Sequence, residues 1–157
     1  MIAVADASPV CYLILIGEID LLPQLFDQVL LPREVLRELL AEAAPPLVRS
    51  WASTLPAWVS VEDVPSGPDA GLEQLQKGER AAILLAESKL AGVVLLDDKS
   101  ARSAATGRGL RVTGLLGLLA EASNRELVDL AAAVERLAKT NFRSSPLLLR
   151  SILERFC

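Results

Sequence analysis

Several acidic side chains stand at the edges of apolar segments, where their charge is costly without a partner. Asp6, for example, follows residues 2–5, all of which are apolar. A carboxylate in such a place is stable when it is solvated, hydrogen-bonded, paired with a cation or bound to a metal ion. The acids that stand in this way are Asp6, Glu38, Glu79, Asp97 and Asp98.

Carboxylate oxygens are the only metal ligands that this set offers. The chain contains no histidine, and its two cysteines, Cys11 and Cys157, lie near opposite ends of the sequence. Carboxylates favour hard cations, so we expect Mg²⁺ or Mn²⁺ as the cofactor rather than zinc. The lack of histidine excludes Ser–His and Cys–His catalysis. No glycine-rich loop followed by Lys-Ser or Lys-Thr is present to cradle phosphate.

Each acid also has an ordinary structural interpretation. Asp6 could belong to a turn, but Ser8 before Pro9 already offers a helix cap there, which favours a functional role for Asp6. Glu38 lies close to the apolar stripe of its helix and is a stronger candidate. Glu79 could simply stabilise a helix start through the helix dipole, so its value comes from recurring with the other acids.

Asp97 and Asp98 end one apolar strand, and neighbouring side chains of a strand point to opposite faces. One of the two is therefore expected to reach a shared crevice, while the other caps the following helix. Strand alternation alone leaves open which of the two reaches the crevice, so both are candidate metal ligands. The cations that follow this pair could bind a nucleic-acid backbone by charge or could be ordinary surface residues; they are Lys99, Arg102, Arg108 and Arg111.

The elements that must position these acids alternate between strand and helix. Apolar runs predict strands at residues 2–5, 28–31, 58–61, 93–96 and 110–112. Periodicity and caps predict helices at residues 10–16, 19–26, 32–42, 47–55, 72–90, 99–106, 113–122, 126–139 and 146–156. Such alternation indicates a mainly parallel sheet covered by helices, in which acids at the carboxyl ends of the strands share one crevice.

The composition indicates one domain with a substantial core in a chain of 157 residues. Hydrophobic residues make up 52% of the chain, so we expect its leucine-rich helices to leave an apolar patch for a second copy or a partner chain. No apolar run could cross a bilayer, and no basic segment precedes the first one, which favours the cytoplasm. The net charge is −4, but residues 93–157 are basic on balance and could form either a basic face or an evenly charged surface.

Five segments carry a further signal when they are taken in order. They are residues 6–9 (DASP), 32–39 (PREVLREL), 78–86 (GERAAILLA), 95–102 (LLDDKSAR) and 112–117 (VTGLLG). Together they resemble the PIN-domain family of small metal-dependent ribonucleases, in particular its short prokaryotic branch related to the toxins of toxin–antitoxin pairs. Residues 141–144 (NFRS) also resemble that branch.

The resemblance implies a three-layer α/β/α fold with a central, mainly parallel sheet and C-terminal helices. A single domain is expected over residues 1–157, with residues 124–157 as a C-terminal helical extension. The implied activity is divalent-metal-dependent cleavage of phosphodiester bonds in RNA, with a small antitoxin protein as partner.

The resemblance also assigns roles to the acids. The family's catalytic acids map onto Asp6, Glu38, Glu79 and Asp98, and Ser8 resembles a hydroxyl residue that supports the site. The metal ligands are expected among Asp6, Glu79, Asp97 and Asp98. One or two Mg²⁺ or Mn²⁺ ions held there would activate a water for in-line attack on a phosphodiester.

Two other functions remain open. A receiver-like phosphoacceptor domain also has acids at strand ends, but it needs an adjacent acid pair after its first strand, where Asp6 stands alone. A non-catalytic PIN-like module that binds nucleic acid or protein would share the whole pattern. A nuclease assay with and without Mn²⁺ distinguishes that module from an enzyme.

Overall fold

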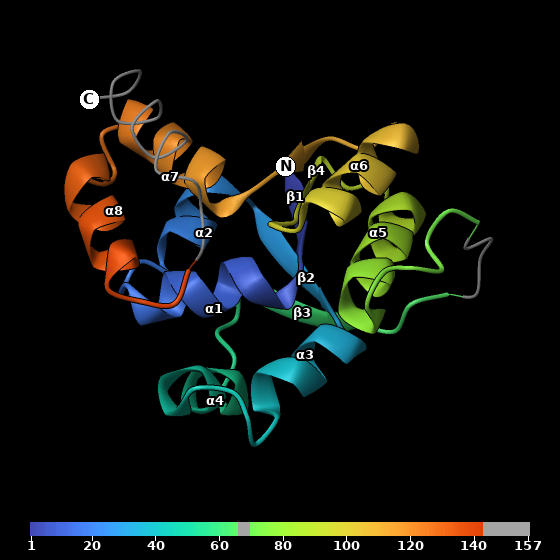
Figure 1. The fold of residues 1–157 in the computed structure, drawn as a ribbon, viewed down its shortest axis with the longest axis horizontal. Coiled ribbons are helices and arrows are strands. Elements are labelled where there is room, and N and C mark those ends of the chain that lie inside the picture. Colours follow the sequence, from blue (N-terminus) through green and yellow to red (C-terminus); the bar gives the residue numbers. More distant parts are fainter. Residues whose placement is uncertain (66–69, 143–157) are drawn as a thin grey trace.

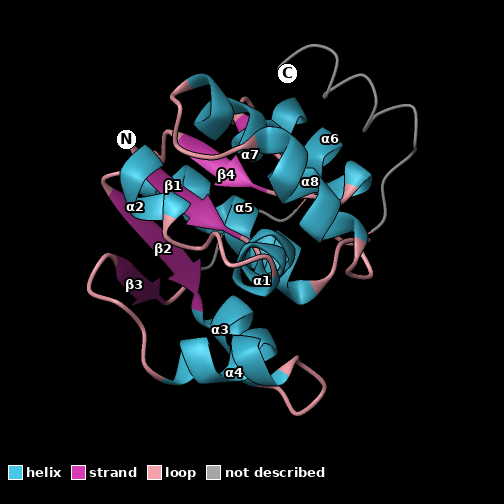
Figure 2. Cartoon of the chain, turned by 90° about the vertical axis from the view of Figure 1, so that its left-hand side faces the viewer, coloured by secondary structure: helices cyan, strands magenta, loops and turns pink. Residues whose placement is uncertain are grey.

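A five-stranded sheet forms the centre of the structure, a computed structural model that describes residues 1–65 and 70–142. The strands lie in the order β3-β2-β1-β4-β5, and all neighbouring pairs run parallel. Figures 1 and 2 show the sheet with helices around it. The strands are β1 (Ile2–Ala5), β2 (Gln28–Pro32), β3 (Val59–Glu62), β4 (Val93–Leu95) and β5 (Val112–Thr113).

Helices cover both faces of this sheet. α5 and α6 pack on one face, and α1, α2, α7 and α8 pack on the other (Figure 1). This arrangement confirms the predicted three-layer α/β/α fold with a central parallel sheet. The helices within the described residues are α1 (Ala7–Leu15), α2 (Leu21–Leu25), α3 (Arg33–Leu40), α4 (Pro46–Ser53), α5 (Lys77–Lys89), α6 (Lys99–Gly107), α7 (Leu115–Asn124) and α8 (Leu130–Ala138).

The central strand β1 is buried on both of its faces. Ala3 and Ala5 belong to the core that α1 and α7 share, whereas Val4 belongs to the core under α5 and α6. All three residues are completely buried. A strand that is covered on both sides requires a continuous apolar run, and this explains the lack of polar residues before Asp6.

The direction in which the chain winds reverses next to β1. From β1 the chain adds β2 and β3 on one side, and it then returns to add β4 and β5 on the other. The carboxyl ends of β1 and β4 therefore flank the topological switch point, the place where open α/β sheets bind ligands. Ala5 pairs with Leu95, so Asp6 and Asp97 leave the sheet at neighbouring positions.

Two helices begin differently from the sequence prediction. α1 starts at Ala7 with Asp6 at its cap position, so the prediction that Ser8 caps this helix is wrong. Ser8 lies within the first turn, where its hydroxyl is free to reach the site. Gly78 lies within the first turn of α5, and the residues just before Lys77 form turns rather than the predicted helix.

The C-terminal part also differs in its boundaries. The helix predicted over residues 126–139 is reduced to α8, because Asp129 Oδ1 accepts a hydrogen bond from the Ala132 N–H and caps the helix there. The helix predicted at residues 146–156 lies outside the described residues. Among the helices that the structure describes, none has the length and apolar character needed to span a membrane.

Candidate active site

Asp6 is a nearly completely buried carboxyl group at the switch point, with only 6% of the residue exposed. No lysine or arginine of the described residues forms an ion pair with it. The pKa of Asp6 rises from 3.8 to about 7, mainly because burial penalises the charged form. The backbone N–H of Ala7 opposes this rise, whereas three neighbouring acids add to it, namely Glu38, Glu79 and Asp97.

Asp97 is the second inward-facing acid of the site. Its Oδ1 accepts a 2.7 Å hydrogen bond from the backbone N–H of Leu115, at the start of α7. Its Oδ2 accepts a longer hydrogen bond, 3.4 Å, from the Ser8 hydroxyl. Burial raises the pKa of Asp97, while these two hydrogen bonds and the nearby Arg102 partly oppose the rise. Asp97 is therefore fixed in orientation from two sides and faces Asp6.

Asp98 has a different position from the one that we expected. It is exposed, and its Oδ2 accepts a 3.0 Å hydrogen bond from the Ala101 N–H, so Asp98 is the N-cap of α6. The division between one inward acid and one cap is present, but the two residues are exchanged relative to the expectation. The reason is that the chain turns into α6 directly after Asp97, which leaves Asp98 at the helix start.

Glu38 reaches the site from the last turn of α3. Its carboxylate accepts a hydrogen bond from the backbone N–H of Gly78, in the first turn of α5. Burial and the nearby charge of Glu79 raise the pKa of Glu38, and this hydrogen bond opposes the rise. The contact depends on glycine, because a Cβ at position 78 would overlap Glu38 Oε1 and lie 3.1 Å from Asp6 Oδ1.

Glu79 has a structural role in addition to its place beside the other acids. Its Oε1 accepts a 3.1 Å hydrogen bond from the Gln76 N–H, and together they form the capping box of α5. Burial raises the pKa of Glu79, the hydrogen bond from Gln76 opposes the rise, and the charge of Asp98 adds to it. The helix start that the sequence indicated for Glu79 is therefore present.

A cavity of about 430 Å³ opens at four of the five acids, and Glu38 is not among the residues that line it. Its opposite wall comes from α1 and from the segment after α8. The Tyr12 hydroxyl donates a 2.8 Å hydrogen bond to Asn141 Oδ1, and the rings of Tyr12 and Phe142 pack edge to face at 5.1 Å. The lining residues are Asp6, Ser8, Tyr12, Glu79, Asp97, Asp98, Asn141 and Phe142.

The four cations predicted to bind RNA do not form one cluster. Lys99 begins α6 next to Asp98, and the Arg102 guanidinium lies near Asp97 beside Gly114. Arg108 lies at the other end of α6 and forms an ion pair with Glu87 at 2.5 Å. Arg111 precedes β5 and lies at the amino end of the sheet, away from the acids. Only Lys99 and Arg102 are therefore placed beside the site.

The acids fit a hard divalent cation in chemical type. They offer oxygen ligands only, they repel one another, and no protein cation in the described part of the chain pairs with Asp6. Their arrangement is open, since no three acidic or cysteine side chains among residues 1–65 and 70–142 lie close enough to hold one ion as they stand. Glu38 and Glu79 would have to change rotamer to complete such a set.

Sequence reasoning missed two parts of this site. Gly78 lay inside the helix predicted over residues 72–90 and was given no role of its own, although a glycine just before a candidate acid can signal that another side chain approaches the backbone closely. Tyr12 gave no chemical signal, and Asn141 and Phe142 stood out only as part of the segment 141–144 that resembles the family. Most of the chain separates Tyr12 from these two residues, and they meet only where the segment after α8 packs against α1.

Comparison with known proteins agrees with this architecture. A family model described as a PIN domain matches residues 2–156, nearly the whole chain. The chain therefore belongs to the PIN-domain family. Searches among curated proteins and among solved structures gave no match. PIN domains are generally nucleases, so the match supports a nuclease-like fold and, as a broad enzyme class, a hydrolase. The match also replaces the interpretation of the chain as a receiver-like domain.

Proposed function

We propose that this PIN domain is a divalent-metal-dependent endoribonuclease that hydrolyses phosphodiester bonds of RNA. The observation that carries the proposal is the environment of Asp6. This acid is buried among three others at the switch point of the sheet, and its pKa is about 7. A buried carboxylate that no protein cation neutralises in the described residues has the electrostatic character of a cation ligand.

Each side chain has a role that follows from its contacts. Asp6 and Asp97 follow the carboxyl ends of β1 and β4 and would supply the fixed oxygen ligands for Mg²⁺ or Mn²⁺. Glu38 and Glu79 supply further carboxylates after a change of rotamer. Ser8 orients Asp97 through its hydroxyl. A bound divalent ion would supply charge neutralisation at the phosphate and a lowered pKa for an attacking water.

Asp98 acts in this proposal through the structure of α6 and through its charge at the cavity mouth. As the N-cap it fixes the first turn of the helix that carries Lys99 and Arg102. These two cations lie beside the acids and can hold the RNA backbone by charge. The same charges draw phosphate toward an otherwise acidic cavity, which would repel a polyanion without a metal ion.

The proposal extends to a toxin role in the cytoplasm with a small antitoxin protein as partner, or to a homodimer. Apolar side chains on α3 and α4 support a partner surface next to the site, since Leu40 is 43% and Leu47 64% exposed. Light scattering on the protein expressed alone, and on the protein expressed with its neighbouring gene product, tests this extension. A monomer in both preparations would contradict it.

Incubation of the purified protein with single-stranded RNA, with Mn²⁺ or with chelator, tests the activity itself. We expect cleavage with Mn²⁺ and none with chelator. The open arrangement of the acids favours one alternative, a PIN-like module that binds RNA without cutting. That alternative predicts that the protein binds RNA but does not cleave it with Mn²⁺ or with chelator. This result would contradict the proposed activity.

A further inference from the structure

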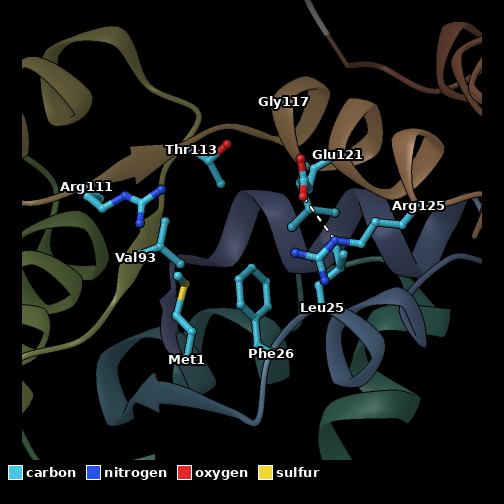
Figure 3. A pocket seen from close by; sticks show the side chains of 10 residues that line it. Met1, Leu25, Phe26, Val93, Arg111, Thr113, Gly117, Glu121 and Arg125 are labelled. Carbon is cyan, nitrogen blue, oxygen red and sulfur yellow. Dashed lines mark hydrogen bonds and ion pairs between the residues drawn. The ribbon is translucent and has the colours of Figure 1, made fainter. Parts of the chain in front are cut away.

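A second cavity, of about 500 Å³, begins at the amino ends of the strands and reaches Thr113, the last residue of β5. Met1 precedes β1, Val93 begins β4 and Arg111 precedes β5, so these residues mark the amino ends of three strands. Segments from the end of α2 and from α7 complete the walls (Figure 3). None of the candidate catalytic acids lines this cavity, so it is a separate feature of the molecule.

The floor of the cavity is apolar. Figure 3 shows Met1, Val93 and Phe26 side by side at its centre, and Leu118 also lines it. Met1 is 51% exposed, so its side chain is open to solvent. The position of Met1 depends on Gly92, because a Cβ there would overlap the Met1 side chain. The cavity therefore presents an apolar surface that is accessible from solvent.

Two polar groups that have no ion pair or side-chain hydrogen bond within the described residues stand at one side of this floor. Arg111 is exposed and forms no ion pair within the part of the chain that the structure describes. The Thr113 hydroxyl likewise makes no side-chain hydrogen bond among the described residues. Gly117 keeps the space at that hydroxyl open, since a Cβ at this position would lie 2.8 Å from Thr113 Oγ1.

The charges around the cavity favour an anion. On the side facing Arg111, the guanidinium of Arg125 pairs with Glu121 at 3.0 Å (Figure 3). Two arginines against one glutamate leave the lining positive, although the whole chain has a net charge of −4. A guanidinium with a free hydroxyl beside it recognises carboxylate or phosphate oxygens.

We infer that this cavity binds a small anion with an apolar body, a carboxylate or a phosphate monoester. The anionic head lies against Arg111 and Thr113, and the apolar body covers Met1 and Phe26. The volume is in the range of about 300–1,000 Å³ that is typical of small-molecule sites, which are mostly apolar with a few polar groups. This inference is independent of the proposed nuclease activity.

Ligand binding here would contact the segment that also holds the acid site. Thr113 and Gly117 line the cavity, and the N–H of Leu115 between them donates to Asp97 Oδ1. The two sites therefore share the start of α7.

Met1 gives a direct test because it is the chain's single methionine. The full chain labelled with methyl-¹³C methionine should show one methionine methyl signal, at the cavity. The probes are octanoate, octyl phosphate and uncharged octanol. We expect octanoate or octyl phosphate to shift the Met1 signal saturably, and octanol to bind at least tenfold more weakly.

Arg111→Gln separates recognition of the anion from general apolar binding. Because Arg111 is exposed, this substitution should lower the affinity for the anionic probe at least tenfold without changing the circular dichroism spectrum. The matched control is Arg37→Gln, which removes an exposed arginine from α3 and should leave the affinity unchanged. The inference is overturned if neither anion gives a saturable shift, if octanol binds equally well, or if Arg111→Gln binds as tightly as the wild type.

Discussion

At the scale of single residues, the site depends as much on a missing side chain as on the acids. Gly78 lets the carboxylate of Glu38 reach the start of α5, and there it accepts the backbone N–H and lies beside Asp6. Alanine would favour the helix by about 1 kcal/mol relative to glycine, so a loss of function on this substitution cannot come from helix propensity. Position 78 therefore tests the geometry of the acids separately from their charge.

Gly78→Ala should reduce metal-dependent RNA cleavage at least tenfold, because its Cβ displaces Glu38. Glu38→Asp shortens the displaced side chain, so the double variant should lose less activity than the two single losses multiplied together. Cleavage rates of the four proteins measure this coupling. Gly107→Ala is the control, since no atom lies within 4 Å of a Cβ there. Wild-type cleavage by Gly78→Ala would refute the account of this contact.

Asp97 and Asp98 should differ sharply when each is changed to asparagine. Asp97→Asn removes an inward charge that two hydrogen bonds orient, and we expect it to lower cleavage by orders of magnitude. Asp98→Asn should keep the α6 cap and most of the activity, because asparagine caps helices as well as aspartate does. Equally severe losses of cleavage in both variants would instead make the pair a joint metal site.

Asp98→Ala completes this comparison at the level of stability. It removes the acceptor for the Ala101 N–H, so it should lower the free energy of unfolding by about 1 kcal/mol. Urea denaturation of the alanine and asparagine variants measures the difference. An alanine variant as stable as the wild type would show that the cap contributes nothing.

Sequence could narrow the pair to one inward acid and one cap, but it could not say which was which. Strand alternation fixes only that the two differ. Which of the two acids points inward depends on where the chain leaves β4. Asp97 is held inward by the Leu115 N–H, a group from a helix that begins 18 residues later than Asp97. Asp6, in contrast, was evident from its position after β1 alone.

At the scale of elements, the start of α5 combines a cap with a candidate catalytic charge in Glu79. Glutamine also accepts the Gln76 N–H in a capping box, so Glu79→Gln should keep the stability of α5 and lose its charge. Glu79→Ala should lose both. We expect the two variants to be similarly impaired in cleavage, with only the alanine variant clearly less stable, by about 0.5–2 kcal/mol.

Thermal or urea unfolding together with cleavage assays of both Glu79 variants tests this division. If Glu79→Gln cleaves RNA as the wild type does, Glu79 is a cap and has no catalytic charge. In that case the catalytic set consists of Asp6, Glu38 and Asp97 alone.

The strands and most helices follow from local patterns because each is a continuous apolar run or an amphipathic repeat. The elements that differ from the prediction are those that long-range contacts decide. The turns before α5 occupy a segment with helical composition, and α8 begins only where Asp129 caps it. β5 is shifted from residues 110–112 to Val112–Thr113 because it pairs with Val94 and Leu95 of β4.

At the scale of the whole molecule, the acids of the site make stability depend on pH. The folded-state pKa of Asp6 is about 7 and its ordinary value is 3.8, so the folded protein binds a proton more tightly than the unfolded chain. Protonation therefore stabilises the fold, and stability without metal falls as the pH rises from about 4 to 7 and then levels off. The effect of Asp6 is at most on the order of 4 kcal/mol.

Asp6→Asn should flatten this pH profile, because the amide does not titrate. Melting temperatures from pH 4 to pH 9 in the presence of a chelator measure the change. Glu38, Glu79 and Asp97 also have raised pKa values, so some of the slope should remain. A wild-type melting temperature that rises steadily between pH 5 and 7.5 would contradict the raised pKa of the buried Asp6.

A divalent ion should reverse this loss of stability. Metal binding needs deprotonated carboxylates, and a ligand that binds only the folded state stabilises it by mass action. We therefore expect Mn²⁺ to raise the melting temperature at pH 8 and to have a much smaller effect at pH 5. An equal shift at both values would indicate binding outside the buried acids.

Sequence could predict the parallel sheet and its helical layers. It could also predict that the acids gather at one edge, because the carboxyl ends of the strands lie together at the switch point in any such fold. The wall built by Tyr12, Asn141 and Phe142 could not, since it arises only when α1 meets the end of α8. The separation of Arg108 and Arg111 from the acids has the same origin, because one helix and one strand carry them to other edges.

The most direct test of the central claim is the rate at which wild type and Asp6→Asn cleave a labelled single-stranded RNA with saturating Mn²⁺. Both proteins are purified identically, and circular dichroism confirms that both are folded. We predict cleavage by the wild type that chelator abolishes, and a rate for Asp6→Asn lower by at least 10²-fold, since a fixed oxygen ligand and its charge are lost. Equal cleavage by the two proteins, or wild-type cleavage that persists with chelator, would contradict a metal-dependent ribonuclease site at Asp6.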